Sequence, residues 1–214
     1  YDDNGYDISD YHAIMKEFGT MEDFDELLDK VHQKGMKLIL DLVVNHTSDE
    51  HPWFIESRSS KNSPKRDWYY WADPKDDGSE PNNWESIFNG STWEFDESTK
   101  QYYFHLFSKK QPDLNWNNKE VRKAVFDMMN WWFDKGIDGF RVDAITHIKK
   151  TFEAGDLPVP NGKTYAPAFD VDMNQPGIQD WLQEMKDQSL SNYDIMTVGE
   201  ANGVTPDDAD EWVG

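Results

Sequence analysis

Three times along the chain, a segment with helical spacing of apolar residues is followed by a short apolar run that ends in polar or ionisable residues. The pairs are 21–34 with 36–44, 119–135 with 139–143, and 177–189 with 195–198. A near-continuous apolar run is typical of a parallel strand covered on both faces. Repeated helix–strand units imply a parallel sheet with right-handed crossovers. The predicted fold class is therefore α/β.

Capping residues mark the ends of the first two helices. Thr20 can cap the first helix, and Asp23 three residues later makes a near match to a capping box. Asn118 can cap the second. Gly35 and Gly136 follow the two helices, at the position where glycine commonly ends a helix. These residues predict where each helix begins and ends.

The strand Gly139–Asp143 alternates apolar and charged residues. A strand has a side-chain period of two, so Phe140 and Val142 share one face while Arg141 and Asp143 share the other. A carboxylate at the end of a buried strand, with a guanidinium two residues before it, points to a functional site. Taken alone, these residues fit a structural Arg–Asp pair equally well.

Residues 47–118 differ in character from the rest of the chain. They are rich in Pro, Gly, Asn, Ser and Trp, and 93–107 reads as a hairpin with its turn near Asp96–Lys100. A stretch this long cannot be a bare loop inside a compact domain, so it predicts a small inserted domain. Residues 145–175 are also rich in loop-forming residues.

Each predicted strand ends in residues that can do chemistry, namely Asp41 with His46, Arg141 with Asp143, and Glu200. Such residues at successive strand ends suit a (β/α)8 barrel. They also suit a doubly wound sheet, but no Gly-rich phosphate turn follows any strand. Glycoside hydrolases use a pair of carboxylates for catalysis, and two carboxylates on neighbouring strand ends can supply such a pair. Arg141 would keep Asp143 ionised at neutral pH, and Glu200 as the acid would need a raised pKa.

Charge and composition narrow the classes of partner. Acidic residues number 42 against 21 basic ones, a net charge of −21, which argues against nucleic acid and anionic membranes. Aromatic residues make up 14% of the chain; most should pack in the core, but a surplus also suits stacking on sugars. The chain has no Cys and no run of about 18 apolar residues, so we expect a cytoplasmic protein without disulfides or membrane spans.

The strand ends resemble three signature motifs of the α-amylase family, glycoside hydrolase family 13. The matching segments are Asp41–His46, Gly139–Asp143 and Val198–Glu200, in the order and spacing of the family. Gln111–Asn115 resembles the form found in the oligo-1,6-glucosidase and α-glucosidase branch, and Asp2–Asp10 is similar to that branch as well. The resemblance covers essentially the whole chain, and its motifs are specific as a set.

The resemblance implies a partial (β/α)8 TIM barrel of about strands 2–5, with domain B inserted after strand 3. Residues 1–46 would be the first barrel part, 47–118 domain B, and 119–214 the second barrel part. The family's fourth signature, a His-Asp pair, has no match before Gly214. We therefore expect a fragment that is inactive by itself.

The resemblance also implies the catalytic roles. Asp143 would be the nucleophile of a retaining enzyme, and Glu200 the general acid and then the base. Arg141 would position Asp143, and Asp41 would support the site from the base of its strand.

The implied sugar subsite draws on two parts of the chain. His46, Asp3 and Tyr6 would line the subsite for the non-reducing glucose, with Asp3 binding hydroxyls and Tyr6 stacking. Phe88 and Gln111, from the insert, would wall the pocket. His46 alone could also be a structural histidine at a strand end.

The substrate is expected to be a short α-1,6- or α-1,4-linked gluco-oligosaccharide. Ala144 follows the nucleophile, where a residue smaller than Val goes with α-1,4 cleavage in this branch, whereas Gln111–Asn115 favours the α-1,6 branch. No metal or other cofactor is expected within this chain, because the branch's calcium loop would precede residue 1. Two alternatives stay open: a transglycosylase or sucrose isomerase of the same family, and a non-catalytic barrel relative used for binding.

Overall fold

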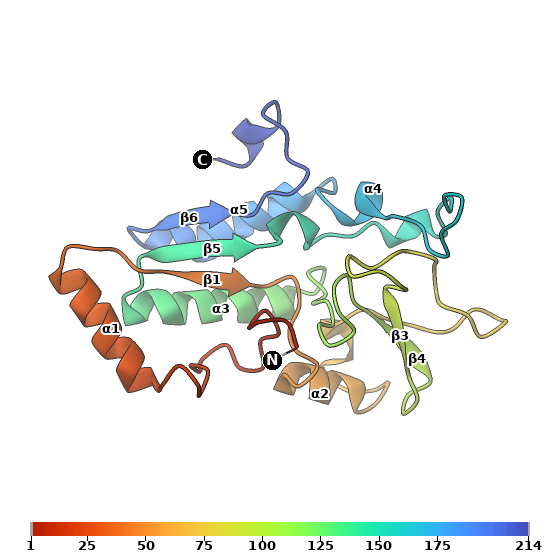
Figure 1. Ribbon diagram of the computed structural model, residues 1–214, viewed down its shortest axis with the longest axis horizontal. Coiled ribbons are helices and arrows are strands. Elements are labelled where there is room, and N and C mark those ends of the chain that lie inside the picture. Colours follow the sequence, from red (N-terminus) through yellow and green to blue (C-terminus); the bar gives the residue numbers. More distant parts are fainter. Residues whose placement is uncertain (1, 214) are drawn as a thin grey trace.

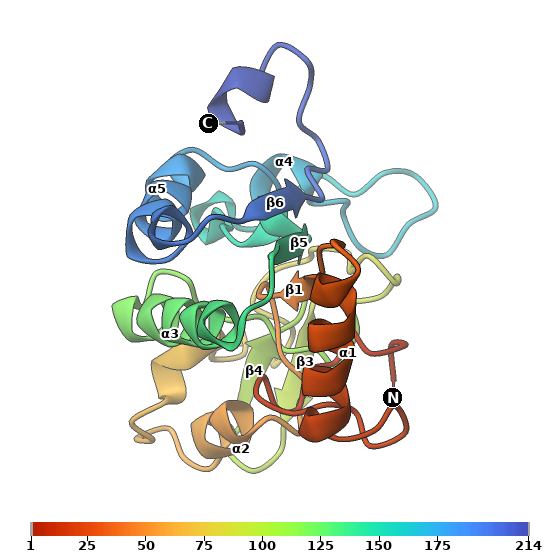
Figure 2. The same cartoon turned by 90° about the vertical axis from the view of Figure 1, so that its left-hand side faces the viewer.

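A three-stranded parallel sheet forms one half of the computed structural model, which describes residues 2–213. Its strands are β1 (Ile39–Val43), β5 (Gly139–Asp143) and β6 (Met196–Gly199), in the order β1-β5-β6. Helices α3 (Lys119–Lys135) and α5 (Ile178–Gln188) lie along one face of this sheet (Figures 1 and 2). The predicted parallel α/β arrangement is confirmed.

The helices begin and end close to the residues that the sequence predicts. Helix α1 (Met21–Gln33) starts at a capping box in which Thr20 and Asp23 bond each other's backbone N–H. Asn118 caps α3 through the Glu120 N–H, and Gly136 ends it with a φ of 108°. Within residues 2–213, no helix has both the length and the apolar character that crossing a bilayer requires.

Strand β1 is shorter and less covered than the sequence predicts. β1 begins at Ile39 and not at Met36, because pairing with β5 starts where Ile39 lies opposite Gly139. Cover on both faces, which the sequence predicts for residues 36–44, does not extend over all of β1, where Ile39 is 37% exposed. Met196 is 57% exposed and Val198 46%, since the helices of residues 2–213 pack on only one side of the sheet.

Gly139 lets β5 and β6 approach each other. Its φ is 153°, and a Cβ built at this residue would lie 1.8 Å from the carbonyl oxygen of Met196. Any larger residue would therefore push β6 away from β5. The position of Glu200, directly after β6, depends on this close pairing.

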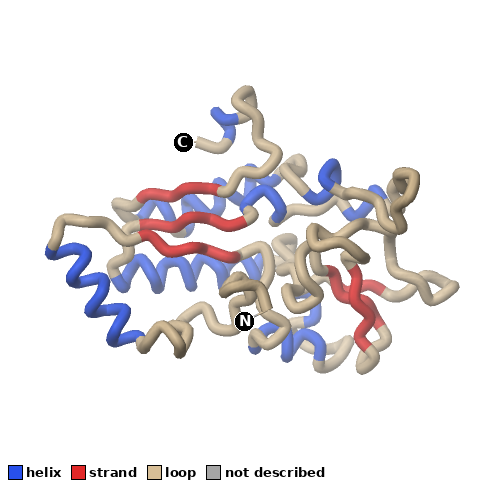
Figure 3. The backbone as a smooth tube through the Cα atoms, viewed as in Figure 1, coloured by secondary structure: helices blue, strands red, loops and turns tan. Residues whose placement is uncertain are grey.

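The segment after β1 forms a second sheet at the carboxyl end of the first (Figures 1 and 3). Strands β2 (Trp71–Ala72), β4 (Gln101–Phe104) and β3 (Trp93–Asp96) pair antiparallel in the order β2-β4-β3. The predicted hairpin is present as β3 and β4. Helix α2 (Pro52–Arg58) and strand β2 were not predicted.

A second apolar core packs the antiparallel sheet against the loop of residues 145–175. Trp84 stacks on Phe152 with ring centroids 5.3 Å apart, and its indole N–H donates to the carbonyl of Gly155 at 2.8 Å. The loop also contains the short helix α4 (Phe169–Asp172). Short 3₁₀ helices lie at Arg66–Trp68, Ile145–His147, Phe152–Ala154, Leu190–Asn192 and Ala209–Glu211. The loop after β5 therefore packs on the insert, while the domain limit at residue 118 stays a prediction.

Asp138, just before β5, ties the opposite end of the sheet together. Its carboxylate accepts hydrogen bonds from the Leu38 N–H (2.8 Å) and Lys37 (3.0 Å) and lies 2.7 Å from the His32 ring. Burial alone would raise the pKa of Asp138, but the bonds from Leu38, His32 and Lys37 lower it to about 2. A folded-state pKa below the unfolded value means that this stabilisation is present above about pH 4 and is lost as the pH falls toward 2.

Asp138→Ala should therefore lower the free energy of unfolding of the full-length protein by roughly 1–3 kcal/mol at pH 7, because three donors lose a charged acceptor. Denaturant titrations at pH 7 and pH 3 would measure the difference from wild type, which should shrink at the lower pH. Asp29→Ala, at an exposed position of α1, is the control and should have an effect within about 0.5 kcal/mol. A difference that does not change with pH would contradict this account of Asp138.

Candidate active site

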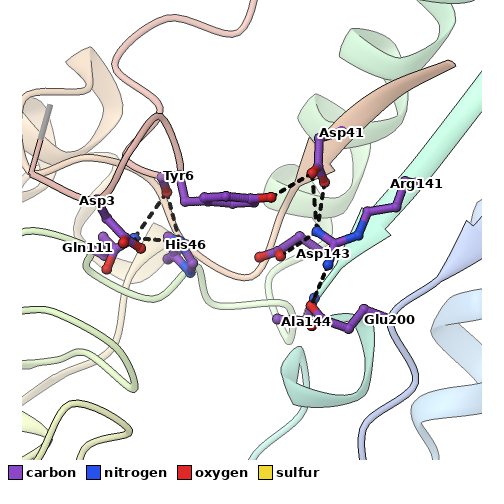
Figure 4. Close-up of polar contacts among 9 residues, drawn as sticks. All are labelled: Asp3, Tyr6, Asp41, His46, Gln111, Arg141, Asp143, Ala144 and Glu200. Atoms are coloured by element: carbon purple, nitrogen blue, oxygen red, sulfur yellow. Dashed lines mark hydrogen bonds and ion pairs between the residues drawn. The ribbon is translucent and has the colours of Figure 1, made fainter. Parts of the chain in front are cut away.

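Four charged residues meet near the carboxyl ends of the parallel strands. Asp41 lies in β1, Arg141 and Asp143 lie in β5, and Glu200 directly follows β6. The register pairs Asp41 with Arg141, and the Glu200 N–H donates to the carbonyl of Val142 at 2.9 Å. We call these four residues the carboxylate cluster (Figure 4).

One guanidinium contacts all three carboxylates of the cluster. Nη1 of Arg141 lies 2.9 Å from Oδ1 of Asp41 and 2.7 Å from Oδ1 of Asp143, and Nη2 lies 2.9 Å from Oε2 of Glu200. The hydrogen bond with Asp41 is the largest influence on Arg141, and it raises the pKa of the guanidinium. Arg141 therefore stays cationic. It holds a pair of carboxylates close together, Asp143 at the end of β5 and Glu200 after the neighbouring strand β6.

Asp143 is the buried member of this pair. Burial raises its pKa to about 6; the hydrogen bond from Arg141 lowers it, and the charge of Glu200 raises it again. From the sequence we predicted only that Arg141 would lower the pKa of Asp143 and keep it ionised. A pKa of about 6 still leaves Asp143 mostly ionised at pH 7.

Ala144 positions Glu200 through its backbone. Its N–H donates to Oε2 of Glu200 at 3.1 Å. Ala144 has a φ of 46°, in the left-handed region that non-glycine residues seldom adopt. The sharp turn after β5 therefore directs a peptide N–H at the carboxylate that follows β6.

A second group, which we call the Gln111 cluster, joins the N-terminal segment to the insert. Nε2 of Gln111 donates to Oδ2 of Asp3 at 2.9 Å, and Nε2 of His46 lies 2.9 Å from the carbonyl oxygen of Tyr6. Burial lowers the pKa of His46, which is therefore neutral at pH 7. The cluster consists of Asp3, Tyr6, His46 and Gln111.

Tyr6 connects the two clusters. Its carbonyl belongs to the Gln111 cluster, and its hydroxyl donates to Oδ2 of Asp41 at 2.8 Å. The ring spans the space between the clusters (Figure 4). The structure thus brings eight of the nine site residues predicted from the sequence into one connected network.

Phe88 is the ninth and lies further out. It is 52% exposed, and its ring meets that of Phe107 at 5.9 Å, while Phe107 lies 5.1 Å from the His46 ring. Phe107 was missed because it is one of many aromatic residues and belongs to no motif. Phe88 is therefore linked to the Gln111 cluster through Phe107.

Sequence reasoning also missed a buried network behind His46, made of Asn45, Asp113 and Lys150. Asn45 and Asp113 stand inside two motifs, which was a signal that could have found them. Lys150 lies in a loop and gave none. Within residues 2–213, no three His, Asp or Glu side chains are grouped to hold a metal ion; a guanidinium supplies the positive charge of the carboxylate cluster.

Comparisons with known proteins agree on one family. The model of the α-amylase catalytic domain matches residues 1–214. The probable oligo-1,6-glucosidase 3 of Bacillus subtilis is 66% identical over 99% of this chain, and the oligo-1,6-glucosidase of Parageobacillus thermoglucosidasius is 60% identical over 96%. The chain spans 38% and 36% of the lengths of these two relatives.

Solved structures give the same answer. A mutant of Bacillus licheniformis trehalose-6-phosphate hydrolase superposes with a TM-score of 0.93 at 47% identity, over 99% of this chain and 37% of that one. The isomaltulose synthase of Protaminobacter rubrum superposes with a TM-score of 0.87 at 46% identity, over 95% of this chain and 36% of that one. The parallel strands β1, β5 and β6 are thus part of a (β/α)8 barrel, and the chain belongs to the α-amylase family, glycoside hydrolase family 13.

Proposed function

We propose that this chain is part of a longer retaining α-glucosidase that acts on short α-1,6- and α-1,4-linked gluco-oligosaccharides. The observation that carries the proposal is the carboxylate cluster, in which Arg141 holds Asp143 and Glu200 together from adjacent strand ends. Retaining glycosidases need two carboxyl groups about 5 Å apart. The oligo-1,6-glucosidases among the relatives support the branch.

In this proposal the two carboxylates divide the reaction. Asp143 attacks the anomeric carbon and forms a covalent glucosyl ester, while Glu200 gives its proton to the oxygen of the leaving sugar. Glu200 then takes a proton from water, which attacks the same carbon and releases glucose with retained configuration.

The remaining residues bind and orient the sugar. Arg141 keeps Asp143 in place, and Asp41 holds both Arg141 and the Tyr6 hydroxyl. Tyr6 offers its ring to the apolar face of glucose. Asp3 and His46 offer hydrogen-bond partners to its hydroxyl groups. Phe88 would stand at the outer wall of the pocket.

Turnover of maltose and isomaltose by the full-length enzyme tests the proposal. Ala144 leaves more room beside Asp143 than Val would, so both disaccharides should be hydrolysed. With p-nitrophenyl α-glucoside, whose leaving group is not a sugar, proton NMR of the first glucose released should show the α-anomer. Initial release of β-glucose would contradict retention, and no release from either sugar would contradict the substrate class.

A sucrose isomerase is the second candidate, because a solved isomaltulose synthase superposes on 95% of the chain. Hydrolysis and transfer share the same carboxylates and differ in whether water reaches the intermediate. Incubation with sucrose separates the two: glucose and fructose indicate hydrolysis, whereas an isomeric disaccharide indicates transfer. A binding protein without catalysis is disfavoured, since Asp143 and Glu200 are both in place.

Residues 1–214 alone should release no measurable glucose from maltose or isomaltose. The sheet's exposed strand β6 carries Met196 and Val198 at the surface, and the chain spans about 38% of its relatives. The pocket around Asp143 is therefore expected to need further elements. A coupled glucose assay on the purified chain, run beside the full-length enzyme, would check this; turnover by the short chain would refute it.

The full-length enzyme should lose kcat/KM below about pH 6. Asp143 must be ionised to attack, and burial raises its pKa to about 6. Because the protonated form is inactive, the rate should fall about tenfold for each pH unit on the acid side. The apparent value belongs to the Asp143–Glu200 pair. A pH–rate profile with buffer controls measures it, and a plateau that extends to pH 4 would contradict the assignment.

A further inference from the structure

A buried ion pair lies behind His46. Nζ of Lys150 is 2.5 Å from Oδ2 of Asp113, and neither side chain is exposed. The ammonium also donates to Oδ1 of Asn45 at 2.8 Å. The three residues come from the end of β1, from the insert and from the loop after β5. Because a buried charge without its partner is energetically costly, Lys150 and Asp113 stay in contact with each other.

Lys150 decides which way the Asn45 amide faces. An ammonium has donors and no acceptor, so the atom of Asn45 that faces it must be the oxygen. The amide nitrogen, Nδ2, therefore faces the other way. It lies 3.1 Å from Oδ2 of Asp113 and 3.2 Å from Nδ1 of His46. The two hydrogens of Nδ2 thus meet two acceptors.

The amide in turn decides which nitrogen of His46 carries the proton. Nδ1 faces a donor and must accept, so the single proton of the neutral ring sits on Nε2. Nε2 lies 2.9 Å from the Tyr6 carbonyl oxygen, which accepts it. The opposite tautomer would set N–H against NH₂ at one end of the ring and two lone pairs against each other at the other end.

Gln111 is consistent with this assignment. Its Oε1 accepts from the Ser108 N–H at 3.1 Å, which fixes the amide orientation. The two hydrogens of Nε2 go to Asp3 (2.9 Å) and to the Tyr6 carbonyl (3.1 Å). The 3.2 Å approach of this nitrogen to Nε2 of His46 therefore needs no hydrogen bond.

We propose that Lys150 is a positioning residue, which acts through Asn45 to keep the His46 proton on Nε2, where it is donated to the Tyr6 carbonyl and holds Tyr6 in place at the sugar subsite. The inference rests on the proposed function, since it is in that function that Tyr6 stacks on glucose. Lys150 never touches the sugar. Its ammonium fixes the orientation of the Asn45 amide, and the amide fixes which ring nitrogen of His46 carries the proton. One tautomer is therefore present before substrate binds.

Nitrogen-15 NMR of histidine-labelled full-length enzyme tests the tautomer directly. The His46 signals are assigned by their loss in His46→Asn. We expect a protonated Nε2 and an unprotonated Nδ1 in the wild type. A proton on Nδ1 in the wild type would overturn the inference without any variant.

Asn45→Asp replaces the donor that faces Nδ1 by an acceptor and leaves Lys150 paired with Asp113. The His46 proton should move to Nδ1, or the ring should become doubly protonated. kcat/KM for isomaltose should fall about tenfold, as expected for one misdirected hydrogen bond. Lys149→Met is the matched control. The Lys149 ammonium lies over the Trp181 ring at 4.2 Å, outside the network, so tautomer and rate should match the wild type.

The double variant Lys150→Met with Asp113→Asn removes both charges and leaves Asn45 without its fixed partner. A mixture of tautomers is expected, whereas a single Nε2–H form would overturn the role of Lys150. If this variant does not fold, the wild-type and Asn45→Asp spectra still decide. The proposed function fails separately: correct tautomers with no hydrolysis of any α-glucoside would leave the inference standing and reject the glucosidase.

Discussion

Asp143→Asn in the full-length enzyme should lower kcat for isomaltose by about 10⁴-fold or more, with KM changed little. The amide cannot form the glucosyl ester, and removing a nucleophile commonly costs at least this much. Asn keeps the size of the side chain and can still accept a hydrogen bond from Arg141, which lies 2.7 Å from Oδ1 in the wild type. The loss should therefore be chemical and not structural.

Asp41→Asn is the matched control for Asp143→Asn. Asp41 contacts the same guanidinium and also holds the Tyr6 hydroxyl, but it lies in β1 and has no role as attacking group in the proposed reaction. Its loss should be clearly smaller than that of Asp143→Asn. Steady-state kinetics and near-UV circular dichroism on both variants would make the comparison. Equal losses, or activity retained in Asp143→Asn, would remove Asp143 from the role of nucleophile.

Glu200→Gln should lower kcat/KM for isomaltose by roughly 10³-fold, within the range that general acid catalysis contributes. The loss should be far smaller for α-glucosyl fluoride, because fluoride leaves without a proton. Gln can keep the contacts of Oε2 with Arg141 (2.9 Å) and with the Ala144 N–H (3.1 Å), since both partners are donors. The geometry of the site should thus survive.

The ratio of the two kcat/KM values, measured for wild type and variant, gives the result. If both substrates lost activity equally, Glu200 would act in binding and not as the acid. A control with the exposed Glu26→Gln on α1 should leave this ratio unchanged.

Local rules were enough to predict much of the fold and the carboxylate cluster. Thr20 and Asn118 cap their helices by accepting hydrogen bonds from residues two or three positions further along the chain. The alternation in Gly139–Asp143 determines which side chains share a face of the strand. The strand ends meet because carboxyl ends of parallel strands lie at one edge of a sheet. Each of these inferences needed only residues close in sequence.

The parts that the sequence did not reveal depend on contacts between distant segments. Lys149 and Lys150 are adjacent lysines in one loop, yet one lies over Trp181 and the other pairs with Asp113 in the interior. Nothing in the two residues tells them apart, because the difference comes from where the insert packs. The raised pKa of Asp143 has the same origin, since burial outweighs the neighbouring Arg141.

Arg141 presents Nη1 to Asp143, and also to Asp41, and Nη2 to Glu200, so the two carboxylates of the proposed reaction contact different nitrogens of one cation. In the proposed reaction, the ester neutralises Asp143 at the moment when Glu200 gives up its proton. A single negative charge therefore crosses from one side of the guanidinium to the other, and the sum of charges around it does not change. Both half-reactions would then proceed in the same electrostatic field, and the site would need no counter-ion from solvent as the intermediate forms and breaks down.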